Sequence, residues 1–197
     1  RDCFTINSHD ITLDCNGYSI NSIGGVNGNG ILFNGDDITV KNCIVDNFNR
    51  GLYLEGSGSV KVENSIFRSN VDGVLVEIGS LEFVDSYSVE NSGNGISSFG
   101  GDFVLKDSVF CDNLFYDLDC DLSNSITADN IYFDDTSGCD LSNPSFSLIR
   151  AGDCASPSAM APYEIEVTQQ PGPQFPNDVF TNTYSCIESN ACNDGQD

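Results

Sequence analysis

The sequence predicts an all-β fold, a parallel β-helix solenoid of about six coils with an extended C-terminal arm. Short runs of alternating apolar residues recur at a period of about 22 residues, and turn-forming Asn, Asp and Gly residues separate the runs. No stretch of about ten or more residues shows the 3.6-residue period of a helix. One coil cannot bury its own apolar face, so stacking of the coils is expected to build the core.

Four consecutive segments carry the repeat most clearly. They are DITVKNCIVDN from Asp37, SVKVENSIFRSN from Ser59, SLEFVDSYSVEN from Ser80 and DFVLKDSVFCDN from Asp102. Apolar and polar residues alternate at the start of each segment, which predicts the first strand of each coil. The residues expected to face the core are Ile38 and Val40, Val60 and Val62, Leu81 and Phe83, and Phe103 and Leu105. The third strands open with Gly30, Gly51, Gly73 and Gly95. The first coil contains a longer insertion, NSIGGVNGNG, which is expected to be flexible.

Two columns of polar residues keep the same period. The first column is Asn42, Asn64, Asp85, Asp107 and Asp129. The second column is Asn70, Asn91, Asn113 and Asp135. Asn and Asp tolerate the left-handed backbone that solenoid turns often need, and stacked Asn side chains can bond from coil to coil. We therefore interpret both columns as structural ladders.

Two segments resemble right-handed parallel β-helix proteins of the pectin-lyase-like superfamily, and most closely its NosD-like branch. They are CFTINSHDITLDCNGYSI and the later GILFNGDDITVKNCIVDNF. The resemblance covers about residues 3–140 and implies a right-handed solenoid. It implies little about activity, because the superfamily includes pectate lyases, polygalacturonases, epimerases, phage tailspikes, adhesins and plain surface modules.

The formal net charge is −23, from 30 acidic and 7 basic side chains. Such a chain repels nucleic-acid phosphates and anionic lipid, which argues against both as partners. The acidity fits solubility or life in high salt, and it equally admits binding of Ca²⁺ or of a cationic partner. No apolar stretch is long enough to span a membrane, so no membrane insertion is expected.

Nine cysteines predict disulfide bonds and therefore a secreted, extracellular or cell-surface location. Zinc is a poor alternative, because the cysteines form no CxxC pairs and His9 is the only histidine. Proximity in sequence suggests four pairs: Cys3 with Cys15, Cys111 with Cys120, Cys139 with Cys154, and Cys186 with Cys192. Cys43 is then left reduced, although spacing does not fix connectivity and a bond between Cys15 and Cys43 stays open.

No set of residues predicts a catalytic site. The pectate lyases of the superfamily use Ca²⁺ held by carboxylates and an Arg or Lys base, but the basic residues of this chain do not cluster. A polygalacturonase-type site needs several Asp with a His nearby, and His9 lies far from the Asp column. The acids Asp117, Asp119 and Asp121 are a Ca²⁺ candidate, although the loop lacks the glycine and the terminal Glu of an EF-hand. We expect no enzyme, and no cofactor unless Ca²⁺ binds.

The chain is expected to divide into a disulfide-stapled solenoid, residues 1–150, and a Pro-rich arm, residues 151–197. Within the arm, YEIEV from Tyr163 and DVFTNTYSC from Asp178 alternate like strands. The arm is able to fold back on its own solenoid or to add a strand to a neighbouring copy. The second arrangement gives a head-to-tail contact that propagates into a filament.

These features favour a secreted structural protein that associates with copies of itself, or with other modules of a longer chain, through the solenoid ends and the arm. The alternative is a carbohydrate-binding or polysaccharide-cleaving β-helix. That alternative predicts a groove lined by acidic and aromatic side chains such as Tyr53 and Phe67, and a glycan as the partner.

Overall fold

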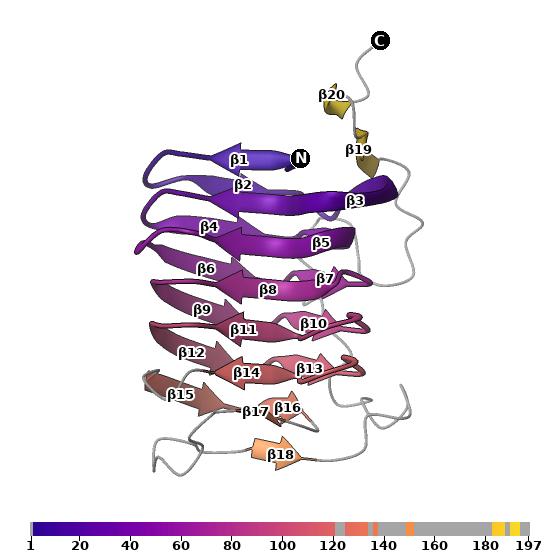
Figure 1. Cartoon of the computed structure of the whole chain (residues 1–197). Helices are drawn as coiled ribbons and strands as arrows, with labels where there is room; N and C mark the ends of the chain where they lie inside the picture. Colours follow the sequence, from indigo (N-terminus) through magenta and orange to yellow (C-terminus); the bar gives the residue numbers. More distant parts are fainter. Residues whose placement is uncertain are drawn as a thin grey trace.

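The computed structural model describes residues 2–120, 125–133, 136–137, 149–151, 183–187 and 190–193. In this part of the chain every regular element is a strand, and the strands stack coil upon coil into a solenoid of about five turns (Figure 1). The described strand pairs are parallel, except that β19 (Thr183–Ile187) and β20 (Asn190–Asn193) are antiparallel. The predicted all-β parallel solenoid is confirmed, with about five turns rather than six.

Two sheets form the walls. Sheet B has six strands in the order β15-β12-β9-β6-β4-β2. They are β2 (Thr12–Asp14), β4 (Ile38–Lys41), β6 (Ser59–Glu63), β9 (Ser80–Val84), β12 (Asp102–Lys106) and β15 (Ser125–Asp129). Besides β19 and β20, sheet A contains β1 (Phe4–Ile6), β3 (Ser19–Phe33), β5 (Ile44–Leu54), β7 (Ile66–Arg68), β8 (Asp72–Val76), β10 (Tyr87–Val89), β11 (Ile96–Ser98), β13 (Val109–Cys111), β14 (Leu118–Cys120), β16 (Ile131–Phe133), β17 (Thr136–Ser137) and β18 (Ile149–Ala151).

Equivalent apolar residues of successive coils meet in the core. In sheet B the paired residues, each of them buried, are Ile38, Val60, Leu81, Phe103 and Ile126. The core-facing residues predicted for the first strands are all buried in this way. Full burial of one such side chain contributes about 1.5–3 kcal/mol, so these columns supply much of the stability of the solenoid.

The insertion in the first coil forms part of a strand rather than a loop. It belongs to β3, which pairs with β5 along much of its length. The register shifts between Asn21 and Val26 and again between Val26 and Asn29, so the extra residues are accommodated as irregularities within the strand. The structure therefore gives an irregular strand where the sequence predicted an insertion without regular structure.

The arm returns to the first long strand of its own chain. β18 pairs with β16 at one end of sheet A, whereas β19 pairs in parallel with β3 at the other end. Figure 1 shows β19 and β20 beside the end of the solenoid that carries the N-terminus. Part of the predicted strand DVFTNTYSC thus forms β19, whereas YEIEV lies outside the described residues.

Candidate functional site

The first polar column lies at the turn that follows each strand of sheet B. Its residues adopt a left-handed backbone, with φ of 55° at Asn42, 44° at Asn64, and 48° at Asp85 and Asp107. The Asn64 side-chain amide donates to Asn42 Oδ1 at 2.8 Å, and the Asn42 amide donates to Asp14 Oδ1 at 2.9 Å. This outer ladder therefore holds neighbouring coils together at the surface.

The last member of the outer ladder is Asn130, not Asp129. The register of β12 and β15 places Asp129 at the end of a strand and aligns Asp107 with the residue after it. Asn130 has φ of 52°, and its amide donates to Asp107 Oδ1 at 2.7 Å. The prediction of Asp129 was wrong because this coil is one residue longer than the coil before it.

The second column, formed by Asn70, Asn91 and Asn113, lies inside the wall. Asn70 and Asn91 are 1% and 2% exposed. Asn91 Oδ1 accepts from the backbone N–H of Asn70 at 3.0 Å, and Asn113 Oδ1 accepts from that of Asn91 at 3.1 Å. The side-chain amides donate to the backbone carbonyls of Val45, Phe67 and Ser88. This inner ladder is satisfied by the backbone of adjacent coils, and Asp135 lies outside the described residues.

Gly51, Gly73 and Gly95 form a glycine column, in which a side chain would collide with the inner ladder. A Cβ at Gly73 would lie 2.8 Å from Asn91 Nδ2 and 2.6 Å from the Gly95 carbonyl oxygen. Gly51 and Gly95 are crowded by the inner ladder in the same way. The predicted glycines and asparagines are therefore one structural unit.

A third ladder is formed by serines. The backbone N–H of Ser65 donates to Ser86 Oγ at 3.0 Å, and that of Ser86 donates to Ser108 Oγ at 3.2 Å. Each hydroxyl donates to the carbonyl two residues before it. The sequence shows the serines in register with Cys43, but buried hydroxyl ladders have no distinctive residue pattern, so their role was missed.

Cys43 is bonded to Cys15, with an S–S distance of 2.05 Å and a Cα–Cα distance of 4.9 Å. The expectations that Cys43 is reduced and that Cys3 pairs with Cys15 were wrong, whereas the alternative pair is confirmed. The reason is geometric: a residue in a solenoid lies closest to its equivalents one coil away, 28 positions along the chain here.

Cys3, Cys111 and Cys120 are disulfide-bonded as well. Cys111 lies in a small apolar cluster with Val109, whereas Cys120 belongs to the main core. The predicted bond between Cys111 and Cys120 stays a prediction. The side chains of the other cysteines lie outside the described part: Cys139, Cys154, Cys186 and Cys192.

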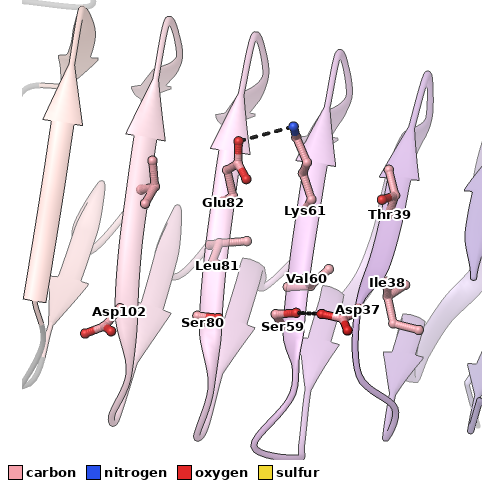
Figure 2. Close-up of a pocket in the computed structure, with 11 residues that line it drawn as sticks. Asp37, Ile38, Thr39, Ser59, Val60, Lys61, Ser80, Leu81, Glu82 and Asp102 are labelled. Carbon is pink, nitrogen blue, oxygen red and sulfur yellow. Dashed lines mark hydrogen bonds and ion pairs between the residues drawn. The ribbon is translucent and has the colours of Figure 1, made fainter. Parts of the chain in front are cut away.

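A shallow groove of about 360 Å³ crosses the outer face of sheet B (Figure 2). One row of side chains lies at the start of β6, β9 and β12 and just before β4: Ser59, Ser80, Asp102 and Asp37. The second row, two residues further along each strand, is Thr39, Lys61, Glu82 and Val104. Six of these eight side chains carry a hydroxyl or carboxylate group, and the apolar residues Ile38, Val60 and Leu81 also line the groove.

Lys61 is held by two carboxylates. Its Nζ lies 2.7 Å from Glu63 Oε1 and 3.2 Å from Glu82 Oε1. The hydrogen bonds to Glu63 and Glu82 raise the pKa of Lys61, so it stays charged. Lys61 is therefore unsuited to act as a neutral base.

Two acids of the groove, Asp37 and Asp102, lie too far apart to act as a glycosidase pair. Asp37 and Asp102 are separated by three strand spacings, about 14 Å. The two carboxyl groups of a glycosidase lie about 5–9.5 Å apart. Ser59 Oγ donates to Asp37 Oδ1 at 2.6 Å, which adds a structural role for this carboxylate.

The aromatic residues expected in a glycan groove lie elsewhere. Phe67 is fully buried in the core, so its assignment to a groove was wrong. Tyr53 lies on sheet A with the Arg50 guanidinium 4.4 Å from its ring centre. Burial and a hydrogen bond to Glu77 raise the pKa of Tyr53 to about 12. Neither ring lines the groove of sheet B.

The Ca²⁺ candidate divides between two environments. Asp117 is fully buried and accepts a hydrogen bond from the Asn113 amide at 2.7 Å, whereas Asp119 is half-buried on β14. Asp121 lies outside the described residues. His9 is exposed, with Nδ1 3.3 Å from Asp36 Oδ2. Among the described residues no three His, Cys, Asp or Glu side chains gather as metal ligands would.

Comparison with known proteins agrees with this geometry. No curated protein and no solved structure gives a significant match. A family model described as the right-handed β-helix region matches residues 3–133, well over half of the 197-residue chain. The chain belongs to the right-handed β-helix family.

Proposed function

We propose that this chain is a non-catalytic structural protein of the extracellular space, of the NosD-like type, which stacks end to end with copies of itself or with further modules of a longer chain. The observation that carries the proposal is the pair of sheet edges at the two ends of sheet B. In the described part of the chain, sheet B ends at β2 on one side and at β15 on the other. An edge strand offers backbone groups for further pairing.

The edge at β2 exposes part of an apolar surface that a second copy could cover. Ile11 and Leu13 are half-buried, whereas Ile38 and Val40, their equivalents one coil further, are fully buried. A second copy placed on β2 would cover this apolar surface as each coil covers the next. Because β2 and β15 run parallel, the contact is head-to-tail and can repeat without closing.

Charge makes the proposed assembly dependent on salt, and cysteine chemistry supports the proposed extracellular location. A net charge of −23 per copy opposes association, and salt or divalent cations reduce this repulsion. The buried Cys15–Cys43 bond fits an oxidising compartment. Among the described residues no helix has the length and apolarity needed to cross a bilayer.

Sedimentation velocity of the full chain, with increasing NaCl or CaCl₂, tests the proposal. The N–H of Thr12 points away from β4, because the Ile11 carbonyl accepts from Thr39 and the Cys15 N–H donates to Lys41. Thr12→Pro therefore removes an edge donor without breaking a bond to β4, and Thr12→Val is its matched control. We expect wild type and Thr12→Val to form larger species as salt rises and Thr12→Pro to stay monomeric. A wild type that is monomeric throughout, or a Thr12→Pro variant that assembles equally well, would contradict the proposal.

A second candidate function is carbohydrate binding in the groove of sheet B, favoured by its rows of hydroxyl and carboxylate groups. Glycan-array binding that is lost in Glu82→Ala but retained in Thr12→Pro would support this candidate. Absence of binding by the wild type would remove it.

A further inference from the structure

β19 adds a parallel strand to only the first part of β3. The backbone partners are Thr183 with Ser19, Tyr184 with Ile20, Ser185 with Asn21, and Cys186 with Ser22. The last part of the same edge is occupied by β1, where Phe4 pairs with Ile31. Two strands from opposite ends of the chain thus share one edge of β3.

The connection to β19 is long compared with the distance it covers. Seven strand pairings separate β18 from β19 through sheet A, which corresponds to about 33 Å. Residues 152–182 lie between these strands, and 31 residues can reach about 100 Å when extended. Chain length therefore does not restrict β19 to the β3 of its own chain.

The connection to β1 is different. Only residues 7–18 separate β1 from β3, and β2, which is paired with β4, lies within them. A β1 strand cannot reach the β3 of another copy without unpairing β2. The two strands on one edge of β3 therefore differ in their freedom to exchange.

We propose that β19 is exchanged between copies, so that β19 of one molecule pairs with Ser19–Ser22 of the next. This inference rests on the proposed end-to-end stacking and specifies its joint. In such a stack the β18 end of one copy faces the β3 end of the next, so β19 reaches the neighbouring β3 over a shorter path than its own. The register and the backbone bonds are the same in both arrangements, as in domain swapping.

Exchange of β19 is expected to depend on protein concentration and to be slow. Because no bond type is gained, the closed form dominates when the protein is dilute, where its own β19 has the higher effective concentration. Exchanged species grow with protein concentration. Each exchange first unpairs β19 from β3, so mixed assemblies form more slowly than molecules collide.

The test mixes equal amounts of full-length ¹⁴N- and ¹⁵N-labelled protein at high and at low concentration. Tyr184 is replaced by the photo-crosslinker p-benzoylphenylalanine, and mass spectrometry identifies the β19–β3 crosslinks. In the assembled fraction we expect about half of these crosslinks to join a light chain to a heavy chain, the statistical value for complete exchange. The matched control carries the same photo-crosslinker in place of Thr5, which pairs with Leu32, and is expected to give crosslinks within one isotope only.

The outcomes separate the two proposals. Assemblies whose β19–β3 crosslinks all join chains of one isotope would overturn exchange and leave end-to-end stacking intact. A chain that forms no assemblies at any concentration would overturn both. If the Tyr184 variant does not fold, as judged by circular dichroism, the same probe in place of Ser185, opposite Asn21, is read in the same way.

Discussion

The inner and outer ladders look alike in the sequence and differ in the structure. Both repeat an Asn or Asp at about 22 residues. The outer ladder, exemplified by Asn64 and Asp85, lies at surface turns, where the backbone is left-handed and Asn or Asp is therefore favoured. The inner ladder, exemplified by Asn91, is buried and bonds to the backbone of neighbouring coils. The sequence period therefore reveals that a ladder exists, whereas the burial of each residue decides which substitutions its position tolerates.

The largest effect is expected where the inner ladder meets the glycine column. In Gly73→Ala the new Cβ would clash with Ser88 Oγ, with the Gly95 carbonyl and with the amide of Asn91. We expect a loss of more than about 3 kcal/mol in the free energy of unfolding, or failure to fold. Urea unfolding measures it, with Gly24→Ala as control, because a Cβ there meets no atom within 4 Å and only the positive φ opposes it. Equal stability of the Gly73→Ala protein and wild type would contradict the crowding.

Substitution of Asn by Asp separates the two ladders directly. Asn91→Asp places a carboxylate in a buried position where an amide donates, and we expect a loss of about 2–4 kcal/mol. Asn64→Asp on the outer ladder, where Asp already occurs in other coils, is expected to cost less than about 1 kcal/mol. Thermal or urea unfolding compares the two. Similar losses at both sites would mean that the ladders do not differ as described.

The Cys15–Cys43 bond joins the first two coils and is expected to have an effect of intermediate size. Cys15→Ser together with Cys43→Ser removes a loop closure of 28 residues, worth about 2–4 kcal/mol. The serine at position 43 continues the serine column, so loss of packing is limited. Unfolding with and without reductant checks this, and a wild type that is insensitive to complete reduction would contradict it.

The smallest effect is expected where two carboxylates, Asp85 and Asp107, are neighbours in the outer ladder. Burial first, and then the neighbouring Asp107, raise the pKa of Asp85 above 3.8. A raised carboxyl pKa means that the folded state binds the Asp85 proton more tightly than the unfolded state does. Proton binding at Asp85 therefore stabilises the fold below pH 3.8, and this stabilisation is lost as the pH rises through the folded pKa. Asp107→Asn removes the charge repulsion, and we expect a small gain at pH 7 that shrinks at low pH. NMR titration of Asp85 checks the pKa, and an unchanged value in the variant would refute the coupling.

Periodicity was sufficient to predict the fold, the core-facing columns and both asparagine ladders. It failed where a coil changes length, because a one-residue increase moves the ladder from Asp129 to Asn130. It also failed where proximity in space differs from proximity in sequence, as for Cys15 and Cys43. The groove of sheet B was not predicted in its observed form, because outward-facing Ser, Thr and charged residues have no distinctive pattern.

End-to-end stacking is tested most directly by negative-stain electron microscopy of the full chain, at low and high protein concentration in the presence of salt. End-to-end stacking predicts rods of constant width whose lengths increase in steps of one solenoid and shorten on dilution. Isolated rods of one length at every concentration would contradict it.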